Sequence, residues 1–263
     1  MDEVRGRMRQ LFRHAIEQSV RWAFQVDLYA DAFERLAIFD RSRLLSATFQ
    51  HKIAQELRHH PLLFIHVPKN GGTSLKRSLY AHDPGHSTVR YYDWLEPSLR
   101  SSAVCFALIR NPVERFLSSF DFLMNGGGSD VSIQPAARRR LSKVRSVDQF
   151  LDYLESINGD WFKVDTFARP QWWYIADRDG RIAIDHLWVI GEQDTEISAL
   201  LNKHGFPSPS HANRTKRVER RLSPQQHARV ERLYGPDFPI YDAVSRQLGA
   251  GRNELAAIKV PQV

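Results

Sequence analysis

The stretch PLLFIHVPKNGGTSLKRSLYA (residues 61–81) decides the fold. It opens with LLFIHV, a short and nearly continuous apolar run, which is the pattern of a strand buried on both faces of a parallel sheet. Two glycines follow within a tight turn, and SLKRSLYA then has the apolar spacing of a helix. The stretch therefore predicts a strand, a glycine turn and a helix in direct succession.

A second unit of the same kind lies at AVCFALIRNPVERFLSSFDFL (residues 103–123). The apolar run predicts a strand, and the helix after it has its start signals in order. Asn111 stands at the N-cap, Pro112 at the first helical position and Glu114 in the first turn. A third buried strand is predicted at HLWVIG (residues 186–191), before a helix at 195–205. Such units predict an α/β fold with a parallel sheet flanked by helices.

The first sixty residues differ from the rest of the chain in their apolar spacing and in their content of Gly and Pro. They have helical apolar spacing, and neither Gly nor Pro occurs between Gly6 and Pro61. We expect an N-terminal helical extension at 1–60, one α/β domain at 61–248 and a short tail at 249–263.

Composition removes several classes of protein. The chain has 263 residues, and 42% of them are hydrophobic, so it can bury a core and is not a disordered chain. A single cysteine, Cys105, cannot form a disulfide within the chain or a cysteine metal cluster. No run approaches 18 apolar residues, and the charged N-terminus does not have the pattern of a signal peptide. These features predict a cytoplasmic protein without a transmembrane segment.

The net charge of +7 suggests an anionic partner without identifying it. Basic residues concentrate at 136–145 and 214–232, and each segment also fits a solvated helix face. A nucleic-acid-binding module therefore stays an alternative, although no motif of that class is present.

The glycine turn after the first strand has the composition of a phosphate cradle. Gly71 and Gly72 let backbone N–H groups approach an anion, and the start of the helix adds its positive end. Thr73 and Ser74 add hydroxyl groups, and Lys69 adds a mobile positive charge. It is not a Walker A loop, because the lysine precedes the glycines. An ordinary turn beside a solvated lysine is the other interpretation.

The second unit offers a further anion site. Arg110 ends a strand at the edge where α/β folds bind ligands. Arg115 and either Ser118 or Ser119 follow at helical spacing, so a guanidinium and a hydroxyl share one face. A capped helix with surface arginines explains the same residues without a ligand.

Taken together, the two segments resemble a known family. FIHVPKNGGTSL looks like the 5′-phosphosulfate loop of the sulfotransferases that use 3′-phosphoadenosine 5′-phosphosulfate (PAPS), and LIRNPVERFLSSF looks like their 3′-phosphate motif. The style is that of the carbohydrate branch, which includes uronyl 2-O-sulfotransferases, and of its bacterial relatives. The resemblance implies a P-loop-like fold, PAPS as donor, no metal, and a hydroxyl-bearing acceptor such as a carbohydrate or glycolipid.

The resemblance also assigns roles to residues. It implies that Lys69 is catalytic, and that the Gly-His step at His86 matches the segment carrying the catalytic base in the 2-O-sulfotransferase relatives. His82 and then Glu192 are the next candidates for the base. The residues implied in donor binding are Lys69, Asn70, Gly71, Gly72, Thr73, Ser74, Arg110, Ser118 and, in a loop closing over the nucleotide, Arg214.

Three further interpretations of the sequence have weaker support. A P-loop-like kinase or nucleotide hydrolase is disfavoured by the missing G-K-[ST] and the lack of a clear magnesium-binding carboxylate. His82 and His86 are four residues apart, but Pro84 and Gly85 break the helix that a metal pair at this spacing needs. The segment RPQWW (residues 169–173) has the composition of a sugar-stacking surface, although paired tryptophans are more often core.

Overall fold

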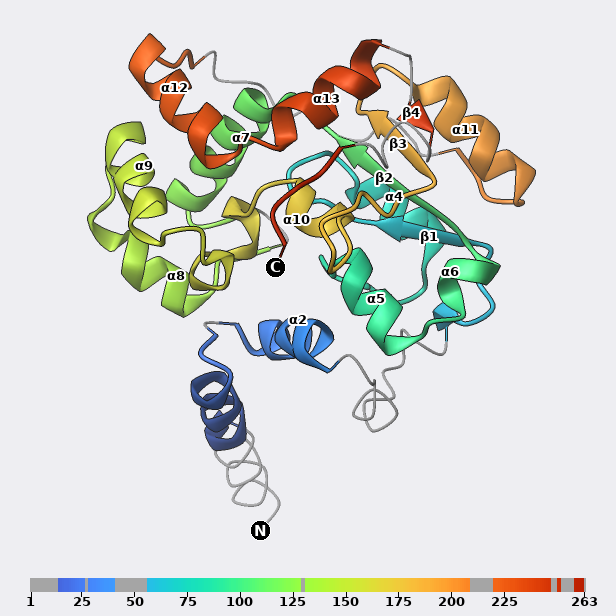
Figure 1. Cartoon of the computed structure of the whole chain (residues 1–263), viewed down its shortest axis with the longest axis horizontal. Helices are drawn as coiled ribbons and strands as arrows, with labels where there is room; N and C mark the ends of the chain where they lie inside the picture. The colour runs from blue at the N-terminus through green and yellow to red at the C-terminus, as the bar shows by residue number, and fades with distance from the viewer. Residues whose placement is uncertain are drawn as a thin grey trace.

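Three parallel strands form the centre of the computed structural model, which describes residues 14–26, 28–40, 56–128, 131–208, 220–246, 250–251 and 258–262 (Figure 1). The sheet order is β1-β2-β3-β4. Its strands are β1 (Leu62–Ile65), β2 (Val104–Ile109), β3 (His186–Val189) and β4 (Ala250–Gly251). The first three are parallel, and short β4 is antiparallel to β3. The predicted α/β class with a parallel sheet is confirmed.

The strands are apolar on both faces because helices cover both faces. All four residues of β1 are buried, and in β2 only Val104 is partly exposed. Leu62 pairs with Val104, and Phe106 pairs with His186. This register brings the carboxyl ends of β1, β2 and β3 to one edge of the sheet.

Helices follow the strands where the sequence predicts them. Asn111 begins the helix after β2, because its Oδ1 accepts hydrogen bonds from the N–H groups of Val113 and Glu114 at 3.0 and 3.2 Å. The α-helices are α2 (Tyr29–Phe39), α4 (Thr73–Leu79), α5 (Val89–Leu95), α6 (Leu99–Ser102), α7 (Pro112–Met124), α8 (Pro135–Arg140), α9 (Val147–Ser156), α10 (Trp172–Ile175), α11 (Asp194–Lys203), α12 (Pro224–Leu233) and α13 (Asp237–Arg246). The 3-10 helices are η2 (Leu141–Lys143), η3 (Trp161–Lys163) and η4 (Thr166–Ala168).

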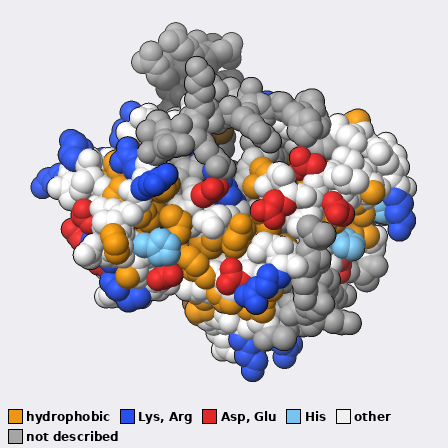
Figure 2. Space-filling view, turned by 90° about the horizontal axis from the view of Figure 1, so that it is seen from above, with side chains coloured by type: hydrophobic (Ala, Val, Ile, Leu, Met, Phe, Trp, Pro, Cys, Tyr) orange, Lys and Arg blue, Asp and Glu red, His pale blue; other side chains and the backbone are white. Residues whose placement is uncertain are grey.

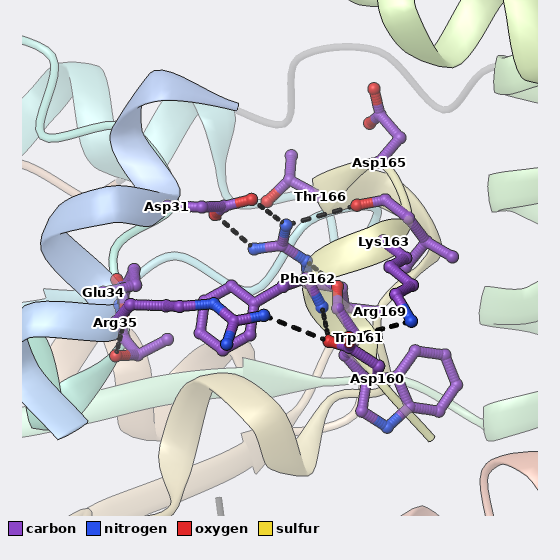
Figure 3. Close-up of polar contacts among 12 residues, drawn as sticks. Asp31, Glu34, Arg35, Asp160, Trp161, Phe162, Lys163, Asp165, Thr166 and Arg169 are labelled. Carbon is purple, nitrogen blue, oxygen red and sulfur yellow. Dashed lines mark hydrogen bonds and ion pairs between the residues drawn. The ribbon is translucent and has the colours of Figure 1, made fainter. Parts of the chain in front are cut away.

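The N-terminal region is helical over 14–23 and in α2, and α2 packs against α5 (Figure 1). Polar side chains of α2 reach into the body of the protein (Figure 3). Asp31 forms a two-pronged ion pair with Arg169, and both side chains are buried. Arg35 forms an ion pair with Asp160, with 3.6 Å between Nη2 and Oδ1. The extension is therefore attached to the α/β body, while its boundary at residue 60 and the boundary at 248 stay predictions.

The RPQWW segment lies in the core rather than on the surface. Arg169, Trp172 and Trp173 are each at most 3% exposed. The Trp173 ring stacks under the guanidinium of Arg90, with 4.3 Å between the carbon and the ring centroid. The sugar-stacking interpretation is wrong, because no face of either tryptophan is left for a ligand.

Candidate active site

One buried amide joins the two predicted anion-binding segments. The Gln171 side chain accepts hydrogen bonds at Oε1 from Asn70 Nδ2 (2.8 Å) and from the Arg110 N–H (2.9 Å). Its Nε2 donates to the Arg110 carbonyl at 2.8 Å. Asn70 Nδ2 also donates to the Leu108 carbonyl at 2.8 Å, so the loop after β1 is tied to the end of β2. Asn70 as a whole is 1% exposed, so its side chain holds the loop in place from within the protein.

A second buried group fixes Gln171 in turn. Both carboxylate oxygens of Asp237, at the start of α13, accept backbone N–H groups, from Gln171 and Trp172, at 2.8 Å each. Burial raises the pKa of Asp237 to about 6, and these hydrogen bonds oppose the rise. Sequence reasoning missed Gln171 and Asp237, because nothing in the local pattern links Gln171 to Asn70, 101 positions earlier, or Asp237 to Gln171, 66 positions earlier.

The backbone of the glycine turn has a conformation in which side chains are disfavoured or have no room. Lys69 and Gly71 both have left-handed backbones, with φ of 68° and 71°. A Cβ on Gly71 would lie 2.2 Å from Ile190 Cδ1, and one on Gly72 would lie 2.7 Å from Phe64 Cζ. Within the described residues, the N–H groups of Gly71 and Gly72 donate to no other protein group. Gly71 is exposed and Gly72 is buried, and unpaired N–H groups at the start of a helix are groups that can bind an anion.

Lys69 carries its charge at the edge of this turn. Its Nζ lies 4.0 Å from the centroid of the Phe122 ring, a cation–π contact that orients the side chain. Partial burial, together with the positive charges of Arg115 and Arg110, lowers the pKa of Lys69 to about 8, and the charge of Asp121 opposes this effect. A bound anion would remove this repulsion, so the site favours a negatively charged ligand.

Two arginines add positive charge near Lys69, and α7 adds two serines. Arg110 is paired with Glu114, with 3.1 Å between Nε and Oε2. Arg115 is 1% exposed; its Nε donates to the Pro68 carbonyl at 3.3 Å, and its two terminal nitrogens have no partner among the described residues. The Ser119 hydroxyl donates to the Arg115 carbonyl and is buried, whereas Ser118 is partly exposed. Ser118 is therefore the serine that can meet a ligand.

His86 lies against the strand that leads into the glycine turn. Its Nδ1 is 2.9 Å from the His66 carbonyl oxygen, and the two imidazole centroids are 4.3 Å apart. Because a carbonyl only accepts, Nδ1 carries the proton and Nε2 keeps its lone pair. Burial lowers the pKa of His86 to about 4, and the bond to His66 opposes this effect. The ring is neutral at pH 7 and can accept a proton at Nε2.

The other candidate bases are placed less well. His82 is exposed beyond the end of α4, and its Nδ1 lies 2.9 Å from Glu56 Oε2. Glu192 is exposed in the turn after β3. His66 is 6% exposed, and burial lowers its pKa well below the ordinary value. Arg214 lies outside the described residues.

Among the described residues, no group of three or more His, Cys, Asp or Glu side chains could hold a metal ion. No helix in the same residues is long and apolar enough to cross a membrane.

Comparisons with known proteins show the family of the chain. No curated protein matches the chain. A sequence model of the sulfotransferase family matches residues 57–242, which is more than two thirds of the chain. The matched span contains the glycine turn, Arg110, Ser118 and His86. The chain belongs to the sulfotransferase family, and it is a transferase of sulfuryl groups.

Proposed function

We propose that this enzyme moves the sulfuryl group of PAPS to a hydroxyl group of a carbohydrate, glycolipid or similar acceptor. Among its relatives we place it with a bacterial type of the carbohydrate branch that resembles uronyl 2-O-sulfotransferases. The proposal goes further than family membership, because it commits to the donor, to the class of acceptor and to individual residues.

The observation that carries the donor assignment is the tie through Gln171. It holds the glycine turn and Lys69 beside Arg110 and the start of α7, so two cationic groups face one edge of the sheet. PAPS has two separate anionic parts, a 5′-phosphosulfate and a 3′-phosphate. The residues fit them: the turn with Lys69, Thr73 and Ser74 would hold the first, and Arg110 with Ser118 would hold the second. Arg214 would close over the nucleotide.

The chemistry is an in-line displacement at sulfur. The acceptor oxygen forms a bond to sulfur while the bond between sulfur and the 5′-phosphate oxygen breaks. The proton of the acceptor hydroxyl passes to Nε2 of His86, and adenosine 3′,5′-bisphosphate (PAP) leaves. Negative charge grows on the departing phosphate oxygen, where Lys69 and the free N–H groups of the turn stabilise it.

The remaining alternatives receive less support. On the face drawn in Figure 2, Lys and Arg side chains are interspersed with Asp and Glu side chains, unlike the basic stripe of a nucleic-acid-binding surface. A kinase or nucleotide hydrolase would need magnesium, and the lysine of the glycine turn precedes the glycines, so the G-K-[ST] order of a Walker A loop is missing.

An acceptor screen tests the proposal. Wild-type enzyme and PAPS labelled with ³⁵S are incubated with desulfated glycosaminoglycans, neutral oligosaccharides and glycolipids, in EDTA, and the products are examined by mass spectrometry. The proposal expects label on one acceptor class with release of PAP. Label on none of them, together with magnesium-dependent hydrolysis of ATP, would contradict it.

A further inference from the structure

A buried contact links the N-terminal helix α2 to the segment that carries His86. Glu34 of α2 accepts two hydrogen bonds from Thr88, one from its N–H at 2.9 Å and one from its hydroxyl at 2.5 Å. Glu34 is 6% exposed and Thr88 is 1% exposed. The Thr88 hydroxyl oxygen also accepts the Tyr91 N–H at 3.1 Å and so caps α5. One carboxylate therefore fixes both the backbone and the side chain of Thr88.

Thr88 is the last anchor of the loop that presents His86. At the near end, Lys76 and Asp83 form an ion pair with 2.5 Å between Nζ and Oδ2, and Asp83 also accepts the Gly85 N–H. In the middle, His86 donates to the His66 carbonyl. At the far end, two residues after His86, the described contacts of Thr88 outside its own helix go to Glu34.

The contact between Glu34 and Thr88 is not explained by stability alone. Burying a carboxylate is costly, and burial raises the pKa of Glu34 despite the nearby charge of Arg90 and the two bonds from Thr88. A buried polar network is weak evidence for stability, but it defines one geometry sharply. The family match begins at residue 57, so Glu34 lies outside the matched span.

We propose that Glu34 is a positioning residue, which holds Thr88 and thereby sets the place of His86 in the active site. The N-terminal helix α2 then contributes to the geometry of the active site. Figure 3 draws Glu34 on α2 beside Arg35, and at 6% exposure Glu34 is buried. The inference rests on the proposed function, since it gives His86 the role of base.

The test compares Glu34→Ala with a matched control, Asp40→Ala. Asp40 caps α2, and its Oδ2 accepts the Trp94 Nε1–H at 3.1 Å. The control thus removes another acidic contact between α2 and α5, but at the opposite end of α5. Glu34→Gln, which keeps the size and one acceptor, serves if the alanine variant does not fold.

Four quantities are measured on the full chain, well below each unfolding temperature. They are hydrogen exchange at the Thr88 amide, the ¹⁵N spectrum of the His86 imidazole, the Kd of PAP, and kcat with the acceptor found in the screen. For Glu34→Ala we expect exchange at Thr88 to quicken at least about 100-fold and the single His86 tautomer to be lost. We expect kcat to fall at least about tenfold, with the Kd of PAP within about twofold of wild type. Asp40→Ala should change exchange, kcat and Kd by less than about threefold.

Two outcomes would overturn the inference. In the first, Glu34→Ala or Glu34→Gln keeps the Thr88 protection, the His86 tautomer and kcat. In the second, Asp40→Ala loses kcat as much as the Glu34 variants do, which would reduce Glu34 to one of several docking contacts. Failure of the proposed function looks different, because the wild type itself would then transfer no sulfuryl group from PAPS.

Discussion

For Gln171→Leu, the loss in free energy of unfolding can be estimated from the hydrogen bonds that the substitution removes. Leucine keeps roughly the volume of glutamine, so little cavity is created. It removes three hydrogen bonds, from Asn70 Nδ2, from the Arg110 N–H and to the Arg110 carbonyl. At about 1 kcal/mol each, and with the partly buried backbone of Arg110 left unpaired, the free energy of unfolding should fall by about 3–5 kcal/mol.

A second buried glutamine provides the control. Gln193 is 0% exposed, its Oε1 accepts the Val189 N–H at 2.5 Å, and its Nε2 has no partner among the described residues. Gln193→Leu loses one hydrogen bond and removes an unpaired donor, so its cost should be at most about 1–2 kcal/mol. Urea unfolding of both variants measures the difference. Equal costs, or a loss below about 1 kcal/mol for Gln171→Leu, would refute the claim that Gln171 ties the two segments together.

Three further predictions concern turnover. Lys69→Ala should lower kcat at least about 100-fold but weaken PAP binding less than about tenfold, because the charge of Lys69 matters most as the leaving phosphate becomes negative. Steady-state kinetics and calorimetry measure the two effects. An unchanged kcat would show that Lys69 is a surface lysine without a catalytic role. His86→Ala should lower kcat by about 100-fold or more with PAP affinity retained, whereas His82→Ala should keep full activity; the reverse result would make His82 the base. The pH–rate profile should rise as His86 loses its proton, near its pKa of about 4, and fall as Lys69 loses its proton, near its pKa of about 8. A profile that is flat between pH 7 and 10 would contradict the role of charged Lys69.

Much of the fold follows from local signals in the sequence. The apolar runs give β1, β2 and β3, because strands covered on both faces need no polar positions. Asn111 and Pro112 give the start of α7, because a cap depends on residues only two or three positions apart. The glycine turn is equally local, although its left-handed residues are Lys69 and Gly71, and Gly72 has a φ of −74°.

The site is only partly readable in this way. The ties made by Gln171, Asp237 and Glu34 join residues 54 to 101 positions apart, and no spacing rule links them. Burial is also not visible in the sequence: His86 is expected to titrate near neutral pH, and its surroundings lower the pKa to about 4. For the same reason, RPQWW could be a ligand surface or core until its environment is seen.

Calorimetric titration with PAP in EDTA tests the central claim, that the turn after β1 and the end of β2 form one donor site. If they do, wild type binds PAP without metal, and Arg110→Ala weakens binding by about 1.5–3 kcal/mol, a factor of about 10 to 150. Arg139→Ala, which removes an equal charge from the exposed end of α8, should bind PAP as wild type does. Binding of ATP with magnesium but not of PAP, or equal PAP affinity in wild type and Arg110→Ala, would contradict the account.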